Sequence, residues 1–181
     1  MSKAVLISIR PKWVQKIAND EKTIEVRKTK PKLDAPFKCY IYCTLPKYPH
    51  EDFIATNYPI PQFYGGGKVI GEFICDRIDR LAPANEPYGI YDIDDDYVLQ
   101  TCLENGALWD YGHGTPLYGW HISDLRIYDT PKELSEFKTL CRVDADCCAC
   151  PYYNYTKMGC DGRVIGRPPQ SWCYVDDVQA K

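Results

Sequence analysis

A carboxylate with basic residues nearby has the residue types of a polar binding pocket. Glu25 and Arg27 lie two residues apart in the alternating run Thr23-Ile24-Glu25-Val26-Arg27. In a strand their side chains leave the same face, about 7 Å apart. With Lys22 and Arg10 added, the group could hold a phosphate while the carboxylate accepts a base N–H. The alternative is an ordinary surface ion pair on an edge strand, which contributes at most about 1 kcal/mol.

Cysteines form a second group with possible chemistry, because six of the ten fall within residues 141–173. Two of them form a C-x2-C pair, the spacing at which two thiolates bind one side of a tetrahedral zinc ion. The predicted ligands of a structural zinc are Cys147, Cys150, Cys160 and Cys173. Cys141 or Cys148 could substitute for one of them. The alternatives are a pair of disulfides, or thiols that serve as small buried apolar side chains.

Short strands and few helices are predicted to position these residues. We expect strands over 4–9, 23–27, 38–43, 68–78 and 117–128, and short helices over 11–19 and 131–137. The first helix has Trp13 on its apolar face. A further helix, capped by the aspartates 94–96, is expected to end near Gly106. Residues 44–66 are predicted to be a loop. Gly71 lies inside an expected strand, which indicates a bulge or a close backbone approach. The fold class that follows is α+β, with a compact barrel and short flanking helices.

Several segments resemble one known family. Ser8-Ile9-Arg10-Pro11, then a helix, then the segment 21–28 (EKTIEVRK) resembles the signature of the ASCH domain family. That signature is a small turn residue followed by Lys, then Glu, then Arg in a strand, and Lys22, Glu25 and Arg27 fill these positions. Segments 67–73 and 118–122 resemble the barrel strands of the family. The turn departs from the pattern, because it carries Asp20-Glu21 where many members have glycine.

The resemblance covers about residues 4–138 and implies a PUA-like β-barrel, a type associated with RNA and modified-base recognition. The residues then expected to bind the ligand are Ser8, Arg10, Lys22, Thr23, Glu25 and Arg27. Amidohydrolases of this family that act on acetylated cytidine use a threonine nucleophile at the position of Glu25, so that chemistry is not carried over. Other members are described as ribonucleases. If the chain is an enzyme, Lys22 and Glu25 are the expected catalytic residues.

The length and composition allow one domain with an appended module. We expect a barrel over residues 1–140, a cysteine-rich insertion over 141–166, and a closing strand with a tail over 167–181. The 181 residues carry 22 basic and 25 acidic side chains, which excludes a wholly basic nucleic-acid coat. Residues 1–38 nevertheless hold ten basic and four acidic side chains. This excess indicates a phosphate-facing surface or a solvated basic face.

The N-terminal segment and the apolar runs bear on the compartment. No apolar run approaches the roughly 18 residues of a membrane helix, and residues 1–11 lack a secretion cleavage site. A cytoplasmic protein without a membrane partner is expected, with its cysteines reduced. Three functions remain open: a module that binds RNA or a modified nucleoside, a hydrolase that uses the same pocket, and a zinc-stapled protein-interaction module. The sequence does not indicate an oligomeric state.

Overall fold

The computed structural model describes residues 3–56, 62–84, 90–139, 153–154, 159–160 and 162–177. The helices in these residues are α1 (Pro11–Ala18), α2 (Asp95–Thr101), α3 (Asn105–Gly112) and the 3-10 turn η1 (Leu134–Glu136). The strands of the main sheet are β1 (Lys3–Ile9), β2 (Ile24–Arg27), β3 (Phe37–Cys43), β6 (Lys68–Leu81), β7 (Leu117–Glu133), β8 (Lys138–Thr139), β11 (Arg163–Val164) and β12 (Trp172–Asp176). Two small hairpins pair β4 (Phe53–Ile54) with β5 (Phe63–Tyr64), and β9 (Tyr153–Asn154) with β10 (Gly159–Cys160).

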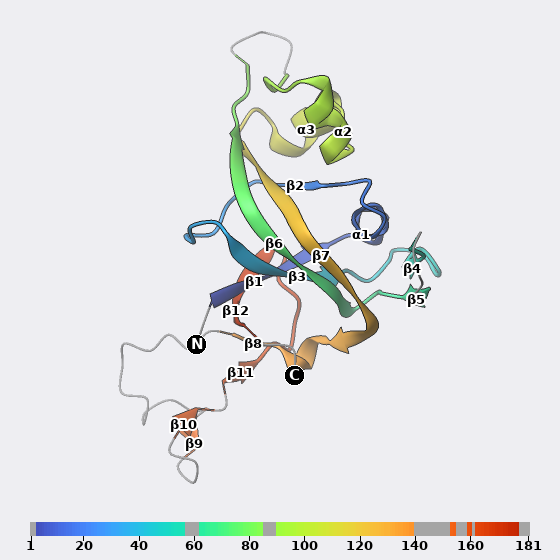
Figure 1. Cartoon of the computed structure of the whole chain (residues 1–181), viewed down its shortest axis with the longest axis vertical. Helices are drawn as coiled ribbons and strands as arrows, with labels where there is room; N and C mark the ends of the chain where they lie inside the picture. Colours follow the sequence, from blue (N-terminus) through green and yellow to red (C-terminus); the bar gives the residue numbers. More distant parts are fainter. Residues whose placement is uncertain are drawn as a thin grey trace.

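One sheet of eight strands organises the described part of the chain. Its order is β11-β8-β12-β1-β3-β6-β7-β2, with β1 and β3 parallel and the other neighbouring strands antiparallel. Figure 1 shows β6 and β7 as a long twisted ribbon, with α2 and α3 together next to β2. The α+β class is therefore confirmed. The expected closure into a barrel is not, because β11 and β2 end the order without pairing with each other among the described residues.

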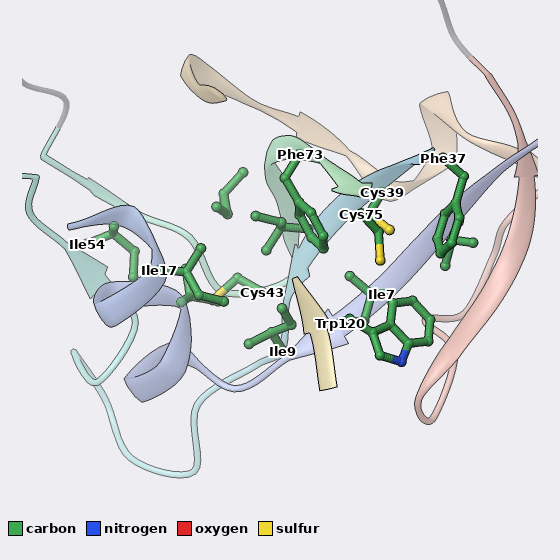
Figure 2. Close-up of a cluster of buried hydrophobic side chains, with 14 residues drawn as sticks. Ile7, Ile9, Ile17, Phe37, Cys39, Cys43, Ile54, Phe73, Cys75 and Trp120 are labelled. Carbon is green, nitrogen blue, oxygen red and sulfur yellow. The ribbon is translucent and has the colours of Figure 1, made fainter. Parts of the chain in front are cut away.

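The core lies on both faces of β1, whose residues Ala4 to Ile9 are all buried. Val5, Ile7 and Ile9 join one apolar cluster, and Ala4 and Leu6 join another on the opposite face. This explains the continuous apolar run, because a strand covered on both faces needs no polar alternation. Figure 2 shows the first cluster, in which Trp120 of β7 lies beside Ile7 of β1.

Three local expectations need correction. The helix predicted over 131–137 is wrong, because β7 continues to Glu133 and only the short turn η1 follows. Helix α3 was not expected, since Gly106 indicated a helix end. In the structure Gly106 lies in the exposed first turn of α3, where a Cβ would meet nothing within 4 Å. The segment predicted as a loop, 44–66, contains the hairpin of β4 and β5.

The irregularity expected at Gly71 is confirmed. The pairing of β6 with β7 shifts register between Val69 and Gly71. A Cβ on Gly71 would lie 2.5 Å from the carbonyl oxygen of Arg126, so only glycine allows the two backbones to approach this closely.

The segment predicted to close the fold forms β12, which pairs antiparallel with β1. Strand β11 also joins the main sheet, although it falls within the range predicted for the cysteine-rich insertion. Most of the rest of that range lies outside the described residues. Among the described helices, none is long and apolar enough to cross a membrane.

Candidate functional site

A pocket of about 470 Å³ opens where β1 and β2 meet α1 and α3. Segments far apart in the sequence supply its walls. The lining residues are Ser8, Arg10, Trp13, Lys22, Glu25, Val26, Arg27, Thr44, Leu103, Ala107, Tyr111, Gln170 and Ser171. The predicted ligand residues Ser8, Arg10, Lys22, Glu25 and Arg27 are thus brought together, and their role toward a ligand remains a prediction.

Arg10 lies at the exposed edge of this pocket because of the proline that follows it. A residue before proline is restricted to extended backbone, and Arg10 has φ −69° and ψ 146°. Pro11 then begins α1, where its missing N–H costs nothing. Trp13, in the first turn of this helix, lines the pocket. The guanidinium of Arg10 makes no hydrogen bond or ion pair within the described part of the chain, so it is available to a ligand.

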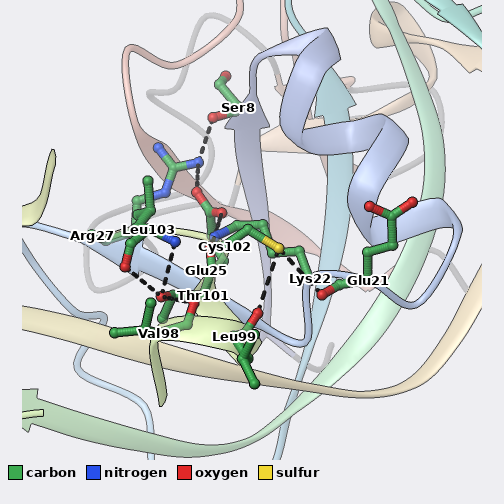
Figure 3. A network of polar contacts seen from close by, with 10 residues as sticks. All are labelled: Ser8, Glu21, Lys22, Glu25, Arg27, Val98, Leu99, Thr101, Cys102 and Leu103. Carbon is green, nitrogen blue, oxygen red and sulfur yellow. Dashed lines mark hydrogen bonds and ion pairs between the residues drawn. The ribbon is translucent and has the colours of Figure 1, made fainter. Parts of the chain in front are cut away.

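The turn after α1 carries Lys22 into the interior. Asp20 has φ +56°, in the left-handed region that glycine adopts most readily and that aspartate tolerates. This explains how the turn forms although it carries Asp20-Glu21 and no glycine. Lys22 is 2% exposed. Its Nζ donates to the carbonyl oxygen of Thr101 and lies 3.5 Å from Glu25 Oε2 (Figure 3). The same nitrogen lies 5.2 Å from the centre of the Trp13 ring.

Burial lowers the pKa of Lys22, and the nearby carboxylate of Glu25 opposes this shift. The carbonyl of Thr101 is at the C-terminal end of α2, where the helix dipole is negative and favours a cation. Lys22 is therefore a buried amine that gives up its proton more readily than an exposed lysine. Such an amine can act as a charged donor or, once deprotonated, accept a proton.

Glu25 and Arg27 complete a buried charged group. Arg27 Nη2 lies 3.0 Å from Glu25 Oε1 and donates to the carbonyl oxygen of Ser8 at 2.6 Å. The side chains of Glu25 and Arg27 are 8% and 9% exposed. The interpretation of a surface ion pair is therefore wrong. The Nε of Arg27 is buried and has no hydrogen-bond partner within the described residues.

Strand β2 is an edge strand by pairing but not by exposure. It pairs with β7 on one side, placing Glu25 opposite Trp120, and all four of its residues are buried. The region of α2 and α3 supplies Leu103, Ala107 and Tyr111 to the pocket wall. Burial raises the pKa of Tyr111, and the charge of Arg27 opposes that shift. The phenol therefore stays protonated in neutral solution.

Thr23 does not line this pocket, although it was predicted to bind ligand. Its backbone N–H donates to the carbonyl oxygen of Gln100, and its own carbonyl accepts from Ile122. Ser8 is buried at the pocket, where its Oγ donates to the carbonyl oxygen of Pro169 at 2.6 Å. The hydroxyl of Ser8 therefore helps to hold the segment before β12.

Eight lining residues were not expected from the sequence, and five of these carry polar or aromatic side chains. The five are Trp13, Thr44, Tyr111, Gln170 and Ser171. Trp13 has helical spacing with apolar neighbours, which indicated the core. The others fall in segments without periodicity, so only the tertiary fold reveals them. The capping pattern of α2 was the one useful signal in this region, since Asp94 accepts from the N–H of Tyr97 as expected.

Two of the four predicted zinc ligands, Cys147 and Cys150, lie outside the described residues. For Cys160 the structure gives a backbone position in β10. Cys173 lies in β12, packs against the second apolar cluster, and has its pKa raised by burial to about 11. Among the described residues, no group of three or more histidine, cysteine, aspartate or glutamate side chains could hold a metal.

Comparisons with known proteins identify the fold through solved structures, but they find no family model and no curated protein that matches the sequence. Solved structures do match. The ASCH protein of Zymomonas mobilis is 18% identical, has a TM-score of 0.55, and the match covers 96% of this chain and 88% of the other.

Two mutants of that protein match equally well. A tyrosine-to-phenylalanine mutant has a TM-score of 0.56, with 97% of this chain and 92% of the other covered, and a serine-to-alanine mutant has 0.55, with 96% and 89%. Each is 18% identical to this chain. At this identity the likeness shows the fold, which is the ASCH fold that the sequence resemblance implied.

Proposed function

From the ASCH fold and the pocket's chemistry, we propose that the protein binds a nucleotide of RNA or a modified nucleoside in the pocket described above. The observation that carries the proposal is the buried group of Lys22, Glu25 and Arg27, which lines a pocket rather than filling a sealed core. Burying three charged side chains is expensive unless they are paired. Lining a pocket with them gives that arrangement a use in recognition.

Each part of the pocket matches a part of a nucleotide. Glu25 has a lone pair left on each carboxylate oxygen after its contacts with Lys22 and Arg27. A carboxylate accepts from a base amino group, as from the N4 of cytosine. Trp13 and Tyr111 supply aromatic surface at the wall. The unpaired guanidinium of Arg10 at the edge suits a phosphate.

A hydrolase is the second candidate, and the lowered pKa of Lys22 favours it. An amine with a lowered pKa, next to a carboxylate, has the properties of a general acid–base group. The two residues would then act on an acylated cytidine or on the phosphodiester of RNA. Thr23 gives no support to a displaced threonine nucleophile, because it does not line the pocket.

One assay separates the candidates. The purified protein is titrated with acylated and unmodified nucleosides and with short single-stranded RNAs, while the same samples are analysed for products by liquid chromatography and mass spectrometry. A binding module gives affinity that weakens with salt and no product. A hydrolase gives product, and Lys22→Ala abolishes it.

The matched variants are Arg10→Ala and Lys3→Ala. Both residues are exposed, but Lys3 begins β1 at its far end, about 20 Å along the strand from the pocket. We expect Arg10→Ala to weaken binding and Lys3→Ala to leave it unchanged. If the wild-type protein neither binds nor converts any member of the panel, the proposal is overturned in favour of an interaction module.

A further inference from the structure

A second pocket, of about 660 Å³, adjoins the first at the start of α1. Its lining residues are Arg10, Pro11, Lys12, Thr44, Leu45, Pro46, Lys47, Tyr48 and Glu51. Arg10 and Thr44 line both pockets. The two pockets are therefore neighbours on either side of these residues.

The charges of the second pocket favour an anion. Arg10, Lys12 and Lys47 are exposed and form no ion pair within the described residues. Glu51 is the one carboxylate among the lining residues, and its Oε2 accepts from the backbone N–H of Tyr48 at 3.3 Å. The second pocket therefore has three cations without an ion-pair partner in the described part of the chain and one carboxylate, which gives it an excess of positive charge.

Exposed apolar surface lies beside these cations. Leu45 and Tyr48 are 72% and 57% exposed. The Nζ of Lys47 lies 5.2 Å from the centre of the Tyr48 ring, so this lysine and this ring form one local unit. An exposed aromatic ring next to basic side chains is the arrangement by which proteins stack the bases of single-stranded nucleic acid.

We infer that the second pocket is a subsite for the neighbouring nucleotide, so that the ligand is a single-stranded RNA of at least two nucleotides. This inference rests on the proposed function of the first pocket. Arg10 contacts the phosphate that joins the two nucleotides, Lys12 and Lys47 contact the next phosphate, and Tyr48 stacks the second base. A free nucleoside would leave this subsite empty.

The test compares ligand lengths. A fluorescent random-sequence RNA hexamer is titrated by anisotropy, and the matching mixture of nucleoside monophosphates is titrated by calorimetry. We expect the hexamer to bind at least about tenfold more tightly, because its second nucleotide binds as part of the same molecule. In the double variant Lys12→Ala/Lys47→Ala this advantage should disappear, while monophosphate affinity stays at the wild-type value.

Salt dependence gives an independent readout. Each phosphate contact with a single strand contributes about 0.7 to the slope of log K against log salt. Because Lys12 and Lys47 contact the same phosphate, the double variant should lower the slope for the hexamer by about 0.7. Tyr48→Ala should lower affinity without changing the slope, and Lys3→Ala should change neither.

Three outcomes overturn the inference. If the wild type binds monophosphates and the hexamer equally, and the double variant does the same, the second pocket is not a subsite although the proposed function stands. If a hexaglutamate peptide binds as tightly as the RNA and loses affinity equally in the double variant, the surface is a general anion site. If no nucleotide of either length binds, the proposed function fails as well.

Discussion

The ammonium of Lys22 and the carboxylate of Glu25 face each other at 3.5 Å inside the protein, with side chains 1% and 8% exposed. The pair of Lys16 and Glu21 lies on the surface a few residues away, at 2.9 Å, with exposures of 35% and 51%. The shorter contact is the weaker contributor to stability, because water already solvates both of its charges. Burial, not distance, separates the two pairs.

Replacing Lys22 with methionine should therefore lower the free energy of unfolding by about 3 kcal/mol, since it leaves a buried carboxylate with one cation fewer. Lys16→Met is the matched control and should cost at most about 1 kcal/mol. Urea unfolding of both variants measures the difference. Equal losses would mean that the burial of Lys22 does not govern its contribution.

Glu25→Gln should change which ligand the pocket prefers. The amide keeps the shape of the side chain but loses its charge and replaces one acceptor with a donor. Relative affinities across the nucleoside and RNA panel are the measurement, and Glu21→Gln, at an exposed residue, is the control. An unchanged order of preference in Glu25→Gln would remove Glu25 from base recognition.

Charge reversal at the pocket is best made at Arg10. Arg27→Glu would place a second carboxylate beside Glu25 in a buried site, so a loss of binding there would not be separable from a loss of folding. Arg10→Glu should retain wild-type stability and weaken RNA binding at every sequence tested. Thermal unfolding and anisotropy measure the two effects, and wild-type affinity would contradict the assignment of Arg10 to phosphate.

Buried thiols should make the protein less stable in alkali. Burial raises the pKa of Cys43 and of Cys75 to about 12, from 9.0. Above pH 9 the unfolded chain loses these protons first, so it binds fewer protons than the native state and stability falls as pH rises toward 12. Each thiol contributes at most about 1.4 kcal/mol per pH unit.

Urea unfolding under reducing conditions between pH 8 and pH 10.5 tests this effect. The double variant Cys43→Ala/Cys75→Ala should lose stability less steeply than the wild type, whatever its stability at pH 8. Cys102→Ala, at a half-exposed thiol, is the control. A double variant with the wild-type slope would show that these thiols do not carry the dependence.

A structural zinc ion in the cysteine-rich segment remains a prediction. Protein purified without chelator should contain about one zinc per chain, and Cys147→Ser/Cys150→Ser should contain none. Cys102→Ser is the control. Because Cys173 packs against apolar side chains, Cys173→Ser is informative: retained zinc would assign the fourth position to Cys141 or Cys148. Metal-free protein with ten free thiols would contradict the prediction.

Local patterns in the sequence predicted the helices and strands whose formation depends mainly on residues close by in the chain. The apolar run before Arg10-Pro11 predicts β1 followed by a helix, and the alternation at Glu25 and Arg27 predicts β2. The same patterns did not predict α3. Gly106 has a low helix propensity and indicated a helix end, but the tertiary fold overrides that local preference. They also did not predict the burial of β2, which depends on helices about 80 residues further along the chain.

The pocket residues divide in the same way. Lys22, Glu25 and Arg27 share one strand and its turn, so their spacing alone places them together. Thr44 and Gln170 reach the pocket only because β3 and the segment before β12 both lie next to β1. No property of their own local sequence distinguishes them from other residues of a loop.

Ser8 couples the pocket to the docking of the C-terminal strand β12. Its carbonyl accepts from Arg27, its N–H donates to the carbonyl of Ser171, and its hydroxyl donates to the carbonyl of Pro169. Residues 169–171 are thus fastened to the same point that fixes the guanidinium of the charged group. A ligand that binds only when residues 169–171 are in place must then stabilise the docking of β12, and detachment of β12 must weaken ligand binding. The free energy of this coupling is the same in both directions.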